Sequence, residues 1–311
     1  MTLTKDQLGR LSETDVRNPI PPEELLPALT SPPFIPSTSL INVRELGAVP
    51  GSAILSGLAY RCGTLELAAT DPQALAWLSA SVKRIFDIRS PEERERAPDP
   101  RIDGVENTWF DSASVDLPPV LDDFVEGGGE VGLRKEYLKV LDIYRRTFSA
   151  VLEHIRDRPG EPFLFHCTAG RDRTGVLAGI LQSLAGTAPD DVRFDYMLSR
   201  IGTEPARERL LRYARVGTGT TADDEHPGFY NMCSLRPSCW NAFVAGVQDM
   251  YGGWEGYVTK TLGFSTEDLE TIRLHLREGN VSNRLRSWLT AANCTSRSVD
   301  KFSSGAIYRQ C

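Results

Sequence analysis

The sequence has no apolar run long enough to cross a membrane and none placed to act as a signal peptide. Its first ten residues are mostly polar, and no later stretch approaches the roughly 18 consecutive apolar residues that a membrane span requires. This pattern excludes stable membrane insertion as a basis for function. We therefore expect a protein of the cytoplasm.

Cysteine is sparse, and no two cysteines form a CxxC pair. Six cysteines in 311 residues are too few and too scattered for a disulfide-stabilised scaffold or a zinc module. We expect reduced thiols, no bound metal and no cofactor. The six positions are Cys62, Cys167, Cys233, Cys239, Cys294 and Cys311.

The chain also lacks an excess of basic residues. Its 35 lysines and arginines are outnumbered by 42 aspartates and glutamates, which gives a formal net charge of −7 and a sequence pI near 5.3. Such a chain has no broad electrostatic attraction for nucleic acids or anionic lipid surfaces, so we expect no nucleic-acid partner. An anionic substrate must be captured by a local positive site.

The sequence does contain short apolar runs that alternate with amphipathic segments. Residues 82–88 and 162–166 are short and mostly apolar, which predicts buried parallel strands. Apolar residues at spacings of three and four predict helices over 137–158 and 174–184. Strands interleaved with long helices indicate an α/β domain. Further helical patterns cover 190–201, 205–215, 238–251, 254–262 and 266–277.

The chain divides into three parts by composition. Residues 1–39 are predicted to form a proline-rich N-terminal arm, extended over 17–39, and the folded body is expected to begin near Leu40. Residues 40–278 would form the catalytic domain, and the polar segment 279–311 a weakly ordered tail. Within the domain, residues 118–132 are predicted to be a mobile loop because they combine two prolines, several acids and three consecutive glycines.

The most informative segment is the ten-residue run HCTAGRDRTG at positions 166–175, which lies between a predicted strand and a predicted helix. Backbone N–H groups of residues 168–173 can converge on the oxygens of a phosphate dianion. The positive end of the following helix points at the same place and stabilises a thiolate as well. Cys167 is therefore expected to be the nucleophile.

Arg173 stands six residues after Cys167. Its planar, permanently charged guanidinium can bind two oxygens of a transferring phosphoryl group, a geometry that lysine does not match. Thr174 can donate its hydroxyl to the Cys167 sulfur. Each residue alone has an ordinary structural explanation, but six constrained positions in ten residues favour a functional site. The expected substrate-binding residues are Thr168, Ala169, Gly170, Arg171 and Thr174.

The cysteine and arginine of this run, with the following threonine and glycine, resemble the signature of the cysteine-dependent protein tyrosine phosphatase superfamily. The form AGxDRTG is similar to its bacterial and fungal tyrosine/serine phosphatase branch. Other segments that resemble this branch are INVRELG at 41–47, YRCG at 60–63, FDIRS at 86–90 with Glu92 and Glu93, and MYGGW at 250–254 with Tyr257, Leu262 and Gly263. The resemblance covers about residues 40–278.

The resemblance implies a phosphatase-like fold, in which helices flank a central, mostly parallel sheet and a helical C-terminal portion forms a lid. It implies hydrolysis of phosphotyrosine in proteins, with phosphoserine and phosphothreonine as further substrates, through a phosphocysteine intermediate on Cys167. No metal is needed for this chemistry, because Arg173 and the loop amides take the place of bound cations.

Breaking a phosphoester also needs a general acid. The resemblance implies that this acid lies inside the loop, immediately before the arginine, where Asp172 stands. The sequence leaves open four alternatives in or near the predicted mobile segment, namely Asp111, Asp116, Asp122 and Asp123.

Four further residues are expected to support the site. Asp87 and Arg89 end a predicted strand, at the edge where parallel sheets bind ligands. They are expected to pair with each other or with Arg61, holding the loop from beneath, in preference to a catalytic role. His166 precedes the cysteine directly and is expected to support the loop as well.

Three other functions compete with this hypothesis. Hydrolysis of phosphoinositides or inositol phosphates is one, although the relatives that do so resemble one another in carrying lysine where this chain has Arg171. A non-catalytic phosphate-binding module is a second, but such modules usually lack the cysteine or the arginine. A sulfur transferase is a third, and the run from Arg173 to Gly175 favours phosphate over it. Separately, Cys62 replaces an expected serine and would capture oxidised Cys167 as a reversible disulfide.

Overall fold

Five short strands form the central sheet, in the order β1-β2-β5-β3-β4. The computed structural model describes residues 3–111, 118–221 and 226–279. β1 is antiparallel to β2, and the other neighbouring strands are parallel. The strands are β1 Arg44–Glu45, β2 Ala59–Cys62, β3 Arg84–Asp87, β4 Glu106–Trp109 and β5 Phe163–His166.

The central strand β5 carries the start of the loop singled out above. All four of its residues are buried, since parallel strands are covered on both faces. His166 lies in register with Cys62 of β2 and Asp87 of β3, so the carboxyl ends of three strands meet where the chain enters Cys167. The two predicted parallel strands are confirmed, and so is the α/β class with helices flanking a mostly parallel sheet.

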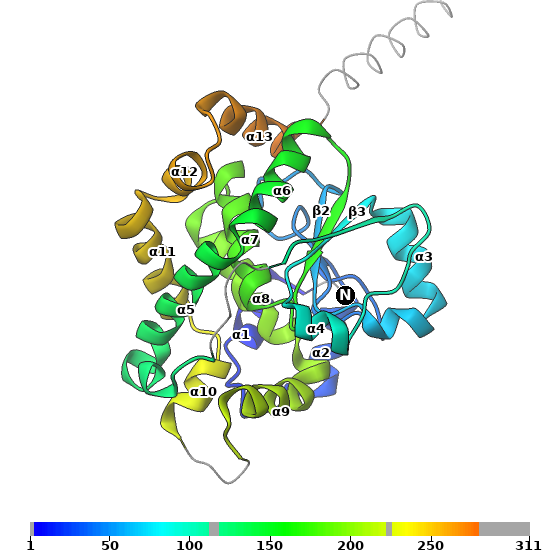
Figure 1. The fold of residues 1–311 in the computed structure, drawn as a ribbon. Coiled ribbons are helices and arrows are strands. Elements are labelled where there is room, and N and C mark those ends of the chain that lie inside the picture. The colour runs from blue at the N-terminus through cyan, green and yellow to red at the C-terminus, as the bar shows by residue number, and fades with distance from the viewer. Residues whose placement is uncertain (1–2, 112–117, 222–225, 280–311) are drawn as a thin grey trace, which may run out of the picture.

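Helices cover both faces of the sheet (Figure 1). α3 lies on one side, with a small core around Leu78, Ile85 and Leu164. α6, α7 and α8 lie on the other side, where the larger core forms. The α-helices of the described residues are α1 Lys5–Ser12, α2 Pro22–Leu29, α3 Pro72–Ser81, α4 Pro91–Arg96, α5 Glu130–Ile143, α6 Arg145–Asp157, α7 Asp172–Ala185, α8 Pro189–Gly202, α9 Arg207–Thr218, α10 Pro227–Cys233, α11 Pro237–Tyr251, α12 Trp254–Gly256 and α13 Thr266–Glu278. Shorter helical turns are η1 Glu66–Thr70, η2 Leu121–Phe124, η3 Glu126–Gly129, η4 Glu204–Ala206 and η5 Tyr257–Thr261.

The predicted helices are mostly found, with one division that periodicity missed. The expected helix over 137–158 is two helices, α5 and α6, which meet at Tyr144. Tyr144 has φ −100° and ψ 20°, outside the helical range, whereas its apolar neighbours continue the same spacing through the break. α10 was not predicted, because seven residues are too few to show a helical period.

The N-terminal segment is folded onto the domain, so the expected extended arm is wrong. Proline at the first position of α2 is tolerated because that N–H has no helical partner. Leu8 and Leu11 of α1 pack with Leu198 and Ile201 of α8 in one buried cluster. Residues before Leu40 therefore pack against the rest of the described fold.

The segment 118–132 is also more regular than the predicted loop. It contains η2 and η3 and the start of α5, and Phe124 is buried within it. Gly127, Gly128 and Gly129 all have positive φ, which lets the chain turn sharply between these elements.

Two expectations remain outside these findings. The division of the chain at residues 39 and 278 stays a prediction, and residues 280–311 of the expected tail lie outside the described residues. Within the described residues, no helix combines the length and the apolar character that crossing a membrane requires.

The packing of α1 predicts a difference between two leucines of the N-terminal segment. Leu8 is 1% exposed, so Leu8→Ala is expected to lower the free energy of unfolding by about 2–5 kcal/mol. Leu26 of α2 is 65% exposed, so Leu26→Ala should change it by less than about 0.5 kcal/mol. Urea unfolding of both variants measures the difference. Equal stabilities would show that α1 does not belong to the cooperative fold.

Candidate active site

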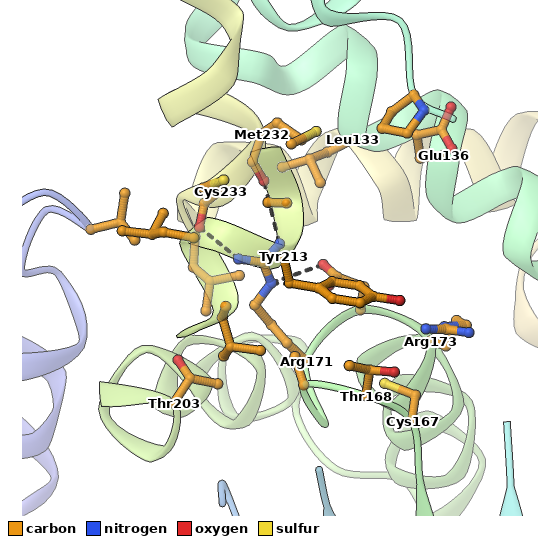
Figure 2. Close-up of a pocket in the computed structure, with 18 of the residues that line it drawn as sticks. Leu133, Glu136, Cys167, Thr168, Arg171, Arg173, Thr203, Tyr213, Met232 and Cys233 are labelled. Atoms are coloured by element: carbon orange, nitrogen blue, oxygen red, sulfur yellow. Dashed lines mark hydrogen bonds and ion pairs between the residues drawn. The ribbon is translucent and has the colours of Figure 1, made fainter. Parts of the chain in front are cut away.

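The loop between β5 and α7 forms the floor of a pocket of about 270 Å³. Cys167 lies there with 2% of its surface exposed. Figure 2 shows Cys167, Thr168 and Arg173 close together at one end of this pocket, with Arg171 reaching away toward Met232 and Cys233. The remaining wall is mainly apolar and includes Phe124, Leu133, Val140, Leu210, Leu211 and Met232.

The carbonyl groups of the loop are bound from outside the pocket. The carbonyl of Thr168 accepts from the Thr64 amide at 3.1 Å. The carbonyl of Gly170 accepts from Asn42 Nδ2 at 2.7 Å and from Arg61 Nη2 at 2.8 Å. Within the described residues, the amides of 168–173 donate to no other group. These N–H groups are therefore free to bind an oxyanion at the N-terminus of α7.

Glycine is required at position 170 for two reasons. Its φ of 64° lies in the left-handed range. A Cβ atom there would lie 2.4 Å from the carbonyl group of Cys62, so the loop can pack this closely on β2 only without a side chain.

Arg173 is held by a carboxylate from α4. Its Nη1 donates to Glu93 Oε2 at 2.5 Å, and its Nη2 donates to Glu93 Oε1 at 2.7 Å. The Arg173 Nε has no hydrogen-bond partner among the described residues. Glu93 therefore orients the guanidinium from one side and leaves Nε available for a phosphoryl oxygen.

Glu93 is fixed in turn by several donors. Its Oε1 accepts from the Thr168 hydroxyl at 2.5 Å, and its Oε2 accepts from the Ser90 amide at 2.9 Å, in the capping box that begins α4. Burial acts to raise the pKa of Glu93, but the charge of Arg173 and these hydrogen bonds outweigh it and lower the pKa to about 2. Glu93 is thus an anion at any working pH.

Asp172 lines the same pocket as Cys167 and is the first residue of α7. Its Oδ1 accepts from the Tyr137 hydroxyl at 2.7 Å, and both of its oxygens lie 3.0 Å from Arg171 Nε. Its side chain is 33% exposed, so one side of the carboxyl group remains open to the pocket.

Comparison with known proteins agrees with this geometry. A sequence model of the tyrosine phosphatase family matches residues 35–278. The chain is 29% identical over 212 residues to a tyrosine-protein phosphatase of Nostoc commune, covering 67% of this chain and 70% of that protein. It is 30% identical over 262 residues to a candidate tyrosine-protein phosphatase of Cupriavidus necator, covering 78% of this chain and 87% of that protein.

The chain belongs to the tyrosine phosphatase family. The resemblance drawn from the loop is thereby confirmed, and so is the expectation of an enzyme of this class.

In this phosphatase the predicted loop residues are brought together, but two of them differ from expectation. All three side-chain nitrogens of Arg171 already donate hydrogen bonds. Nε donates to Asp172, Nη1 donates to the Cys233 carbonyl at 2.6 Å, and Nη2 donates to the Met232 carbonyl at 3.4 Å. Arg171 thus joins the loop to α10 before any substrate binds. The expected hydrogen bond from Thr174 to the cysteine sulfur is not formed, and the buried Thr174 Oγ1 has no partner among the described residues.

The alternative acids that the structure describes do not line the pocket. Asp122 pairs with His226, Asp123 pairs with Lys135, and Asp111 is exposed. Asp116 lies outside the described residues. Of the described aspartates weighed as the acid, Asp172 alone lines the pocket together with Cys167.

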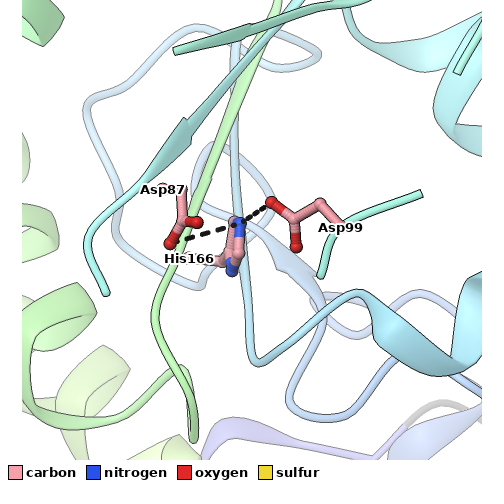
Figure 3. Close-up of side chains that lie close together, drawn as sticks. All are labelled: Asp87, Asp99 and His166. Carbon is pink, nitrogen blue, oxygen red and sulfur yellow. Dashed lines mark hydrogen bonds and ion pairs between the residues drawn. The ribbon is translucent and has the colours of Figure 1, made fainter. Parts of the chain in front are cut away.

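Two of the supporting residues, Asp87 and His166, lie close to Asp99 in a buried network (Figure 3). Arg89 donates to Asp87 Oδ1 at 2.9 Å and to Asp99 Oδ1 at 2.8 Å, and His166 Nε2 lies 3.0 Å from Asp99 Oδ2. Burial acts to lower the pKa of His166, but the charges of Asp99 and Asp87 outweigh it and raise the pKa. Arg61 pairs with Asp195 at 2.6 Å, not with Asp87.

Asp87, Asp99 and His166 are also close enough together to share a metal ion. Two guanidinium groups already neutralise these carboxylates, since Arg89 binds both aspartates and Arg94 Nε lies 3.0 Å from Asp87. The donor set therefore favours an ion-pair network over a cation site.

Sequence reasoning missed several residues that build the site. Glu93 and Asn42 lie inside segments that resemble the family, which could have pointed to them. Tyr137 and Asp195 carry no such signal. Each lies on the buried side of its helix, and nothing in the local sequence shows that this side meets the loop.

Cys62 is fully buried, and its thiol donates to the Gly63 carbonyl at 3.0 Å. It packs in the core on the α3 side of the sheet, whereas Cys167 packs with the larger core on the other side. The proposed disulfide between them stays a prediction.

The Glu93 contacts predict a pH-dependent stability. Because the pKa of Glu93 is depressed from 4.5 to about 2, its contribution is complete above about pH 4.5 and is lost as the pH falls toward 2. Glu93→Gln should lower the free energy of unfolding by roughly 1–3 kcal/mol near pH 7, and the gap to wild type should narrow in acid. Urea unfolding across this pH range measures the gap.

Glu95→Gln is the matched control, because Glu95 is an exposed residue of the same helix. It should follow the wild-type curve at every pH. A gap between wild type and Glu93→Gln that stays constant from neutral pH to acid would contradict the ionised pairing.

Proposed function

We propose that this protein hydrolyses phosphotyrosine in proteins through a phosphocysteine intermediate on Cys167. The observation that supports this most is the arrangement of the loop, with its carbonyls bound outward and its amides unpaired around a buried cysteine. An oriented arginine stands on the same loop. Phosphoryl transfer depends mainly on positioning and charge stabilisation, and this arrangement supplies both.

In the first step the Cys167 thiolate attacks phosphorus in line with the ester oxygen. The P–S bond forms, the P–O bond breaks, and its electron pair passes to the leaving phenolate oxygen. Asp172 gives this oxygen a proton, so that tyrosine leaves as a neutral phenol. Arg173 and the loop amides bind the equatorial oxygens throughout.

In the second step a water molecule attacks the phosphorus of the intermediate. The Asp172 carboxylate takes a proton from this water as the P–S bond breaks. The electron pair returns to sulfur, which restores the thiolate, and inorganic phosphate is released. The two steps together consume one water and return the enzyme unchanged. Because the thiol must stay reduced, we also place the enzyme in the cytoplasm.

The pocket wall favours an aromatic substrate. Apolar side chains from η2, α5, α9 and α10 surround the space above Cys167. The phenyl ring of phosphotyrosine lies between the phosphate and the peptide and covers these walls. Phosphoserine and phosphothreonine lack this ring and leave the walls exposed to water. We infer that phosphotyrosine is the preferred substrate and that the other two phosphoresidues are weaker ones.

Phosphoinositides are not proposed as substrates. A second phosphate group would need a free cation near the loop, and the guanidinium of Arg171 is already bound to Asp172 and to two carbonyls of α10. Cys167 and Arg173 are both present and line one pocket, which argues against a non-catalytic phosphate-binding module.

The nucleophile is tested by removing its sulfur. Wild type should hydrolyse para-nitrophenyl phosphate in the presence of a chelator, and Cys167→Ser should lose turnover to the background rate. Cys239→Ser is the control, because Cys239 is a buried thiol of α11 that does not line the pocket. Acid quenching followed by mass spectrometry should place the phosphoryl group on Cys167. Retained turnover in Cys167→Ser would refute the mechanism.

The acid is tested by comparing two aspartates. Asp172→Asn should lower kcat on a phosphotyrosine peptide by about 100-fold or more, because the phenolate then leaves without a proton. The loss on para-nitrophenyl phosphate should be smaller, since nitrophenolate is a better leaving group. Asp123→Asn should leave both rates unchanged. The opposite pattern would assign the acid to the segment before α5.

A further inference from the structure

The carboxyl group of Asp172 is held by side chains from outside its own loop. The Tyr137 hydroxyl of α5 donates to Asp172 Oδ1 at 2.7 Å, and the Tyr196 hydroxyl of α8 lies 2.9 Å from that of Tyr137. Arg171 Nε lies 3.0 Å from both oxygens of Asp172. One hydroxyl and a guanidinium thus bind the carboxyl group, and a second hydroxyl binds the first.

The two tyrosines are themselves fixed by packing. Tyr137 is 2% exposed and Tyr196 is 1% exposed. The Tyr137 ring meets Phe243 edge-on with centroids 5.3 Å apart, and the Tyr196 ring stacks on Trp240 at 4.7 Å. Phe243 and Trp240 belong to α11, so three helices determine where the Tyr137 hydroxyl lies.

We propose that Tyr137 is a positioning residue for Asp172, which orients the general acid toward the leaving oxygen, and that Tyr196 fixes the direction of its hydrogen bond. This inference rests on the proposed function, in which Asp172 gives a proton to the leaving group.

The direction of the hydrogen bonds follows from counting hydrogens. Tyr137 has one hydroxyl hydrogen, which it gives to Asp172, so Tyr196 must donate to the Tyr137 oxygen. Burial raises the pKa of both tyrosines, and both therefore keep their hydrogens through the working pH range. The chain runs from Tyr196 through Tyr137 to Asp172.

This chain determines which oxygen carries the transferable proton. Arg171 Nε lies 3.0 Å from both oxygens, whereas Tyr137 donates only to Oδ1, so Oδ1 has two donors and Oδ2 has one. The proton of the acid form must then lie on Oδ2, the oxygen that Tyr137 does not bind. Tyr137 thereby selects one of two otherwise equivalent protonation sites and one rotamer of the side chain.

The test compares Tyr137→Phe with Tyr257→Phe. Tyr257 is also fully buried, and its hydroxyl donates to the Leu141 carbonyl of the same helix α5 at 2.6 Å, away from the pocket. Each variant loses one buried hydroxyl: that of Tyr137 lies on α5, and that of Tyr257 donates to α5. Thermal unfolding should therefore show similar losses of stability. Only Tyr137→Phe should alter the acid step.

The expected readout is a split between leaving groups. Tyr137→Phe should lower kcat on phenyl phosphate by about 3–10-fold, the range expected for one lost hydrogen bond, with KM little changed. The loss of kcat on para-nitrophenyl phosphate should be smaller. Tyr257→Phe should change neither. Tyr196→Phe should show the same split at smaller size, because Tyr137 keeps its own hydrogen.

A double mutant separates this proposal from the proposed function. In an Asp172→Asn background, Tyr137→Phe should cause no further leaving-group effect. If Asp172→Asn alone shows no such effect, the acid assignment fails. If Asp172→Asn shows it but Tyr137→Phe slows both substrates equally, or slows neither, the positioning role is overturned.

Discussion

The active-site loop can bind an anion only if its amides face the pocket, and this depends on where its carbonyls go. Each buried carbonyl needs a donor, because leaving one unpaired costs about 1–3 kcal/mol. Asn42 and Arg61 supply these donors to Gly170 from beneath. Arg61 is placed by Asp195, which also binds Arg44, and all three side chains are at most 1% exposed. The anion site is thus built on a buried ion pair. Removing one partner would leave an uncompensated charge under the loop and free the carbonyls to turn.

Two other contacts connect this loop to the rest of the molecule. Glu93 joins Arg173 to α4, and Tyr137 joins Asp172 to α5, so both residues are held by side chains from outside the loop. In both cases a side chain far away in the sequence limits the freedom of a group that the proposed mechanism uses. Pre-organisation of this kind lowers the reorganisation that the reaction requires.

Much of the fold followed from periodicity, and its errors have a common cause. The strands at 82–88 and 162–166 and the helix after the loop were predicted because burial on both faces or on one face leaves a clear apolar spacing. The break at Tyr144 left no such trace, since the spacing runs through it. The N-terminal prolines favour an extended chain when the sequence is considered alone, although proline at the start of a helix costs nothing.

Cys167 and Arg173 could be recognised in the sequence as the candidate nucleophile and the candidate phosphate-binding arginine. Both lie on one continuous loop, whose spacing is set by the backbone. The sequence also indicated Asp172, which is adjacent to the arginine. How these groups are held depends on the tertiary structure. Glu93, Asn42, Asp195 and Tyr137 come from four separate segments, and no local pattern specifies which of their polar atoms will meet the loop. Arg171 shows the same distinction. Its positive charge can be seen in the sequence, but its hydrogen bond to the Cys233 carbonyl of α10 depends on how the helices pack.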